Sequence, residues 1–182
     1  MNRRKLAFGG VAVAAGLAGA AWWKFQSHET APSAFGESPV VDASTVESFW
    51  RLSFDSPDGK SFAMSQFQGK PLLVNFWATW CPPCVEELPL LDYFYQENKA
   101  KGWQVVGLAV DQPSAVRTWL QTRPLNFPLG MAGLGGTQLS KILGNSAGSL
   151  PFSAVFASSG KLLHTKVGKV TPEELGQWLV LK

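Results

Sequence analysis

The sequence predicts an α/β fold in which a central mixed β-sheet is flanked by helices. Two short apolar runs, residues 72–78 and 105–110, are typical of strands that are buried on both faces of a sheet. Between them, residues 82–99 carry apolar side chains at helical spacing, so the first half of the domain is a strand–helix–strand unit. The chain continues with a helix and then with two strands and a last helix, an order that predicts a mixed sheet.

The N-terminus predicts one hydrophobic helix that precedes the domain. Residues 6–23 contain no charge and follow a basic cluster at residues 3–5. As a helix they would span roughly 27 Å, close to the ~30 Å hydrocarbon core of a bilayer. Residues 1–25 are therefore expected to be a signal anchor, favoured by Trp22 and Trp23, or a signal peptide, favoured by the small residues 18–20. Both alternatives place the domain on the periplasmic side of the bacterial inner membrane.

Charge is distributed unevenly along the 182 residues. The formal net charge is +3, but residues 1–25 hold four basic residues and no acidic one, which leaves 12 basic and 13 acidic residues in the remainder. A body with a net charge of −1 has no electrostatic footprint for phosphate, so nucleic acid is excluded as a partner. Residues 26–47, with Pro, Gly and Ser but no periodicity, predict a flexible tether, and residues 48–182 predict the folded domain.

The domain is expected to begin with an N-terminal β-hairpin. Residues 49–54 alternate between apolar and polar, residues 55–59 are rich in turn formers, and the pattern resumes at residues 61–64. After the strand–helix–strand unit, four further parts are predicted: helices at 114–122 and 137–143, a hairpin of strands at 152–157 and 162–167, and a last helix capped by Thr171 with Glu174 in a near capping box.

The chemistry of the chain depends on its only two cysteines, Cys81 and Cys84, which follow a buried strand and open a helix. Free amides and the macrodipole at a helix N-terminus favour an anion, so the thiolate fraction of Cys81 rises, and the thiolate is the nucleophile. Cys84 lies within about one turn and can attack the mixed disulfide to release the product. Pro82 and Pro83 remove two of the amides while they fix the turn.

Two other uses of the cysteines are disfavoured. Zinc needs two more ligands, and the chain offers only His28 and His164, so neither a metal nor another cofactor is expected. A disulfide across two intervening residues closes too short a loop to stabilise much, which favours a reversible redox couple. A copper-binding assembly factor that uses Cys81, Cys84 and His164 is an alternative from another functional class.

A family resemblance follows from residues 74–89, whose sequence is VNFWATWCPPCVEELP. This segment resembles the active site of thioredoxin-fold proteins and is most similar to membrane-tethered TlpA/ResA-type thiol–disulfide oxidoreductases. The resemblance covers about residues 48–182 and implies a thioredoxin-like fold. It also implies that Cys81 is the exposed nucleophile and Cys84 the buried resolving thiol.

The resemblance assigns further residues of the site. Pro151 matches the cis-proline whose loop, with Leu150, holds an extended substrate segment beside the nucleophile. Independently of the resemblance, Trp80 precedes Cys81 and is expected either to contact partners or to pack in the domain, and Pro82 is a further expected substrate-binding residue. Glu87 matches an active-site glutamate of the family. Partial burial near the cysteines would raise its pKa and let it exchange a proton with Cys84, a role for which the neighbouring Glu86 is disfavoured, and the alternative is a solvated helix carboxylate.

The chain departs from thioredoxins proper at one buried position of the site. Asn75 stands where those proteins have a buried Asp, and an Asn side chain cannot shuttle a proton. Pro89 matches a proline that kinks the active-site helix. Residues 112–128 resemble a helical insertion between core strands.

The expected function is an extracytoplasmic thiol–disulfide oxidoreductase that reduces disulfides of substrate proteins through a Cys81–Cys84 couple. The resemblance implies a membrane thiol-donor protein as the second partner and cytochrome c maturation or copper-centre assembly as the setting. A dithiol oxidase would use the same two cysteines in the opposite direction.

Overall fold

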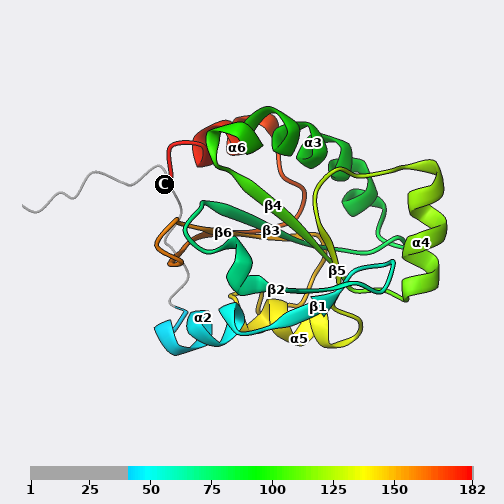
Figure 1. Cartoon of the computed structure of the whole chain (residues 1–182), viewed down its shortest axis with the longest axis horizontal. Helices are drawn as coiled ribbons and strands as arrows, with labels where there is room; N and C mark the ends of the chain where they lie inside the picture. Colours follow the sequence, from blue (N-terminus) through cyan, green and yellow to red (C-terminus); the bar gives the residue numbers. More distant parts are fainter. Residues whose placement is uncertain (1–40, 182) are drawn as a thin grey trace, which may run out of the picture. The chain divides into compact units, whose positions relative to one another are not determined.

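The computed structural model describes residues 41–181 and contains a five-stranded mixed β-sheet (Figure 1). The strand order is β5-β4-β3-β6-β7, where β3 pairs with β4 in parallel and with β6 in antiparallel orientation. The strands are β3 (Leu72–Trp77), β4 (Gln104–Ala109), β5 (Leu129–Met131), β6 (Phe152–Phe156) and β7 (Leu162–Val167). The predicted central mixed sheet is confirmed, with the strand that precedes the cysteines at its centre.

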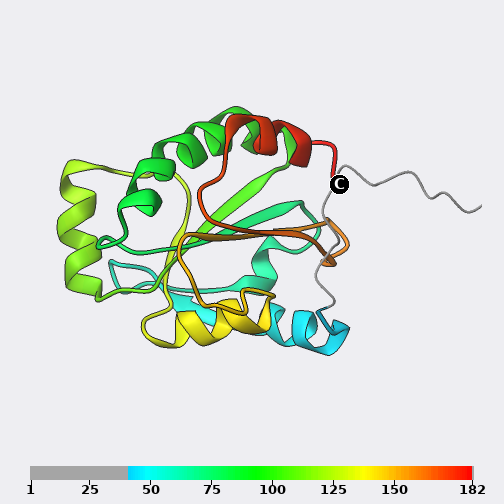
Figure 2. The ribbon, with the colours of Figure 1, turned by 180° about the vertical axis from the view of Figure 1, so that it is seen from behind.

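Helices cover both faces of the sheet. Figures 1 and 2 show α3 and α6 on one face, α2 and α5 on the other, and α4 at the end near β5. The helices are α2 (Ala43–Trp50), α3 (Pro82–Asn98), α4 (Pro113–Thr122), α5 (Gly135–Ile142) and α6 (Pro172–Trp178), with short 3₁₀ turns at Met64–Phe67 and Lys99–Lys101. The last helix has the predicted capping box, in which Thr171 and Glu174 pair reciprocally.

The core is divided by the sheet into two layers, as the period of a strand requires. Leu73 and Trp77 of β3 pack with the layer under α3 and α6, whereas Val74 and Phe76 pack with the layer over α2 and α5. All six residues of β3 are buried. The continuous apolar run that predicted this strand thus serves both faces at once.

The N-terminal end of the domain differs from the prediction. A helix, α2, occupies Ala43–Trp50, where the tether was expected to end and the hairpin to begin, and Asp42 caps it. Val46, Phe49 and Trp50 have the spacing of one helical face and are buried together, which outweighs the alternation that suggested a strand. The hairpin itself is present but short, with β1 (Ser53–Asp55) and β2 (Ser61–Ala63) in antiparallel register.

Strand β5 was not predicted, and it follows the expected helical insertion. The insertion supplies α4, after which three residues run parallel to β4 at the edge of the sheet. A Cβ atom at Gly130 would lie only 2.9 Å from the Phe54 Cβ and 3.0 Å from Phe62 Cζ, so glycine lets the hairpin pack closely on this strand. A three-residue strand with a central glycine carries no periodic signal in the sequence.

The hydrophobic segment at residues 6–23 and most of the predicted tether lie outside the described residues. Within residues 41–181, no helix is both long enough and apolar enough to cross a membrane.

Candidate active site

The two cysteines lie where β3 passes into α3, and they form a disulfide. Cys81 is the N-cap of α3, and the backbone N–H of Cys84 lies 3.3 Å from its sulfur. This N–H is one of the free donors at the helix N-terminus, so the position favours a thiolate on Cys81 once the disulfide opens. Pro82 occupies the first position of the helix, where its missing N–H costs no hydrogen bond.

The two cysteines differ little in accessibility in this disulfide-bonded state. Cys81 is 5% exposed and Cys84 is fully buried. Cys81 is the more exposed of the two, as expected, but the difference in exposure is small. Both belong to the core layer under α3 and α6. Pro82 and Pro83 are exposed and present the turn between the cysteines to solvent.

Glu87 lies one turn beyond Cys84 on the buried face of α3 and is only 1% exposed. Its Oε2 accepts from the backbone N–H of Val170 at 2.7 Å, and its Oε1 accepts from Asn75 Nδ2 at 2.8 Å. Burial raises the pKa of Glu87 from 4.5 to about 7, although both hydrogen bonds and the charge of Lys169 oppose the rise. A carboxyl group that titrates near neutral pH can both take and return a proton.

Glu86 occupies a different environment from its neighbour. Its side chain is exposed and forms an ion pair with Lys169, whose Nζ lies 2.9 Å from Glu86 Oε2. The structure thus separates a solvated carboxylate from the buried Glu87, as expected from the sequence.

The Leu150–Pro151 peptide bond is cis, as the resemblance implied. Pro151 is buried and its carbonyl accepts from the Gly168 N–H at 2.8 Å, while Leu150 is half-buried against the core layer that contains both cysteines. Trp80, next to Cys81, is 66% exposed, in contrast to the fully buried Trp77 on β3. An exposed indole beside Cys81 offers an apolar contact surface at the site.

Asp111, which was not predicted from the sequence, holds the loop in front of the cysteines. Its Oδ2 accepts from the Thr79 backbone N–H at 2.8 Å and from the Thr79 hydroxyl at 2.6 Å. Asp111 follows β4, the parallel neighbour of β3, so the carboxyl ends of the two strands bring it beside Thr79. An acidic residue directly after the second buried strand was the signal that could have revealed this contact.

Replacing Asp111 with alanine is expected to lower the free energy of unfolding by about 1–3 kcal/mol, because two part-buried donors of Thr79 lose their acceptor. Thr79→Val removes the hydroxyl but keeps the backbone N–H bonded to Asp111, so its expected loss is about 1 kcal/mol. Chemical denaturation of both variants gives the comparison, and equal losses would show that the backbone contact contributes nothing.

His164, the third ligand of the copper alternative, lies on β7 with its ring 5.6 Å from that of Trp178. Residues 41–181 contain no group of three or more His, Cys, Asp or Glu side chains that could hold a metal ion.

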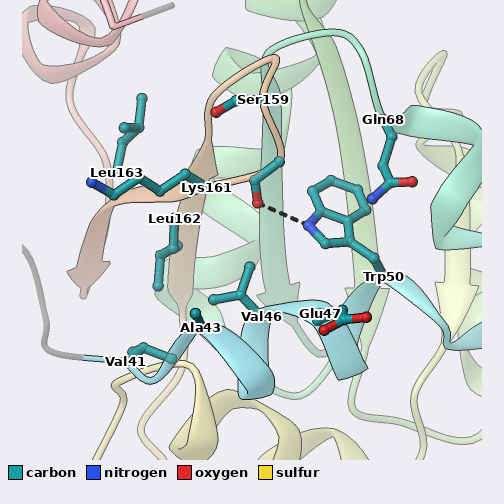
Figure 3. Close-up of a pocket in the computed structure, with 11 residues that line it drawn as sticks. Val41, Ala43, Val46, Glu47, Trp50, Gln68, Ser159, Lys161, Leu162 and Leu163 are labelled. Carbon is teal, nitrogen blue, oxygen red and sulfur yellow. Dashed lines mark hydrogen bonds between the residues drawn. The ribbon is translucent and has the colours of Figure 1, made fainter.

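A cavity of about 470 Å³ lies between α2 and the turn that joins β6 and β7 (Figure 3). Val46 and Leu162 contribute apolar walls, and the Trp50 indole N–H donates to the Gly160 carbonyl at 2.8 Å. The residues predicted to form the site, all within the described range, do not line this cavity.

Comparison with known proteins supports the resemblance. Residues 37–178 match the family described as Redoxin. The chain is 32% identical over 124 residues to a thiol-disulfide oxidoreductase ResA of Bacillus cereus, covering 67% of this chain and 69% of that protein. ResA of Bacillus subtilis is 24% identical over 147 residues, which cover 80% and 78% of the two chains.

A solved structure supports the fold. The crystal structure of a thiol:disulfide interchange protein of the thioredoxin family from Chlorobium tepidum TLS resembles this chain with a TM-score of 0.64 and 28% identity, over 71% of this chain and 91% of that chain. The similarities confirm the resemblance drawn from residues 74–89 and the thioredoxin-like fold.

Proposed function

The chain belongs to the Redoxin family, as a TlpA/ResA-type thiol–disulfide oxidoreductase of the thioredoxin superfamily, and we propose that it reduces protein disulfides outside the bacterial inner membrane. The observation that carries the proposal is the Cys81–Cys84 disulfide at the N-terminus of α3, with the buried Glu87 one turn further on. The substrates are proteins that contain a disulfide.

In the proposed reaction, the reduced enzyme transfers two electrons to its substrate. The Cys81 thiolate attacks one sulfur of the substrate disulfide, forms a mixed disulfide and releases the other substrate sulfur as a thiolate. The Cys84 thiol then loses its proton and attacks the Cys81 sulfur, which closes the Cys81–Cys84 disulfide and releases the second substrate thiolate. The enzyme is oxidised and the substrate disulfide becomes a dithiol.

Glu87 is the proposed acceptor of the proton from Cys84. The two residues are three positions apart on one helix, and both lie on its buried face, so their side chains are neighbours. Solvent does not reach the Cys84 sulfur in this state, because the residue is fully buried. This burial favours an internal base, and a carboxyl group whose pKa is about 7 can accept the proton near neutral pH.

The proposed substrate surface surrounds Cys81. Trp80 and Pro82, which flank Cys81 in the chain, are exposed. Phe152 pairs with Phe76 near the end of β3, so the loop of Leu150 and Pro151 lies at the end of the sheet that leads to the cysteines. The backbone of that loop would pair with an extended segment of the substrate, which positions its disulfide for attack.

The proposed setting is the periplasmic side of the inner membrane, and it depends on residues 6–23. An uncharged segment of 18 residues behind a basic cluster favours an anchor or a cleaved signal, and either one leads to the same compartment. A membrane thiol-donor protein would return the enzyme to its dithiol form there, and cytochrome c maturation or copper-centre assembly would supply the substrates.

A reductase in an oxidising compartment must be kept in its dithiol form. In bacteria that express the full chain, we expect more than half of the protein to be reduced at steady state. Rapid acid quenching followed by thiol alkylation and gel separation measures this fraction. A chain that is mostly disulfide-bonded under these conditions would contradict the reductase and favour the dithiol oxidase.

A further inference from the structure

We propose that the side-chain amide of Asn75 inverts when Glu87 gains or loses a proton, so that the buried carboxyl group keeps a hydrogen-bond partner in both states. The inference rests on the acid–base role proposed above for Glu87 and explains how the site sustains it. Asn75 is then a positioning residue, and Ser153 assists it.

Both hydrogen bonds of the Glu87 carboxyl group are accepted bonds, which match the ionised form. One carboxyl oxygen faces the N–H of Val170 at 2.7 Å, and the other faces the amide nitrogen of Asn75 at 2.8 Å. A carboxylate accepts from both donors, whereas a protonated carboxyl group carries an O–H that must itself donate. A proton that takes the lone pair engaged in either bond gives an O–H that points at another donor.

Only one of the two donors can change its character. The Val170 N–H belongs to the backbone, but the Asn75 amide carries a donor at one end and an acceptor at the other. Asn75 is fully buried, and its Oδ1 has no hydrogen-bond partner. Inversion therefore breaks no bond at the oxygen end, and it places Oδ1 where the Glu87 O–H can donate to it.

Ser153 can follow the inversion because a hydroxyl group both donates and accepts. It lies opposite Asn75 in the register of β3 and β6, and its Oγ accepts from Asn75 Nδ2 at 3.1 Å. When Oδ1 replaces Nδ2, rotation of the hydroxyl turns this acceptor into a donor. In the ionised state, Asn75 Nδ2 bonds both Glu87 and Ser153 while Oδ1 bonds neither. After inversion, Oδ1 bonds both groups while Nδ2 bonds neither, so the Glu87 carboxyl group keeps a partner in each state.

Charged groups from two parts of the chain set the balance between the two states of Glu87. Lys169 favours the ionised carboxylate, Glu174 of α6 favours the protonated acid, and Glu86 on α3 holds Lys169 in an ion pair. The Cys84 thiol is the proton donor one turn earlier on the helix. When Glu87 takes that proton, Cys84 becomes a thiolate, Glu87 becomes a neutral acid, and Asn75 inverts.

The inversion can be observed in the oxidised full chain, in detergent, by NMR without any substitution. Above the Glu87 titration midpoint, a scalar coupling across the hydrogen bond is expected between Asn75 Nδ2 and the Glu87 carboxyl carbon. Below the midpoint this coupling is expected to vanish, and the Asn75 amide signals should shift with the same midpoint. A coupling that persists at low pH, or amide signals that ignore the titration, would overturn the proposal.

A variant gives an independent measurement. Asn75→Ala is expected to raise the titration midpoint of Glu87 by about one pH unit, because the bond to a carboxylate is stronger than the bond to a neutral acid. The matched control is Asn98→Ala, which removes another buried amide of the same domain, one that bonds the Phe94 carbonyl, and should leave the midpoint unchanged. An unchanged or lowered midpoint in Asn75→Ala contradicts the assigned role.

The inference and the proposed function can fail separately. If Glu87→Gln leaves the pH profile of disulfide exchange unchanged, Glu87 is not the base, and inversion of Asn75 has no part in the reaction. If that profile changes but the NMR coupling persists below the midpoint, Glu87 is the base and only the inversion is wrong.

Discussion

Replacing Cys81 with serine is expected to abolish disulfide exchange, whereas replacing Cys84 with serine is expected to leave substrates covalently attached to Cys81. A serine hydroxyl is not a nucleophile toward disulfides at neutral pH, so Cys81→Ser should lose about a thousandfold or more of the exchange rate. Cys84→Ser keeps the attacking thiolate at the helix N-terminus but lacks the group that releases the mixed disulfide.

Trapping in cells that express each variant measures the two roles. Non-reducing gels should show adducts of Cys84→Ser that disappear on reduction, and few adducts of Cys81→Ser. Because the chain has only two cysteines, each single variant retains one candidate thiol, and the double serine variant controls for adducts through any other group. Equal trapping by the two single variants would contradict the assignment of nucleophile and resolving thiol.

The parts of the fold that the sequence predicted are those with a local physical signature. β3 was predictable because six consecutive buried residues serve both core layers, and α6 because Thr171 and Glu174 form a capping box. The pattern around Phe49 and Trp50 fitted both a strand and a helix, because alternation and helical spacing coincide over so few residues. Val46, one turn earlier, completes the buried face of α2, but it lies in a stretch of the sequence that has no clear periodicity.

The parts of the site that the sequence did not predict depend on which strands become neighbours. Cys81, Cys84 and Glu87 lie within one helical segment, so a motif could identify them together. Asp111 reaches Thr79 only because β4 runs parallel to β3, and Ser153 reaches Asn75 only through the antiparallel register of β6. Such pairings follow from which distant segments become neighbouring strands, and the pattern within one segment does not encode its neighbours.

Burial of Glu87 is expected to make the oxidised protein less stable as the pH rises from about 4.5 to about 7. The pKa of Glu87 is about 7 in the folded chain and returns to its ordinary value of 4.5 on unfolding. Between these values the native carboxyl group holds a proton that the unfolded chain has released. The free energy of unfolding therefore falls through this window by about 3 kcal/mol, at ~1.4 kcal/mol for each unit of pKa, and is level above it.

Glu87→Gln removes the titrating group while it keeps the size of the side chain, so its stability should lack this decline. Denaturation of both proteins from about pH 4 to 9 gives the test, because their difference cancels every other titrating group, His164 among them. Relative to wild type, the variant should gain about 3 kcal/mol between about pH 4.5 and 8. Glu97→Gln, an exposed change on the same helix, should keep the wild-type decline. A constant difference between wild type and Glu87→Gln would mean that the pKa of Glu87 is the same in the folded and the unfolded chain. A carboxylate with an ordinary pKa is too weak a base to take the proton of Cys84 near neutral pH.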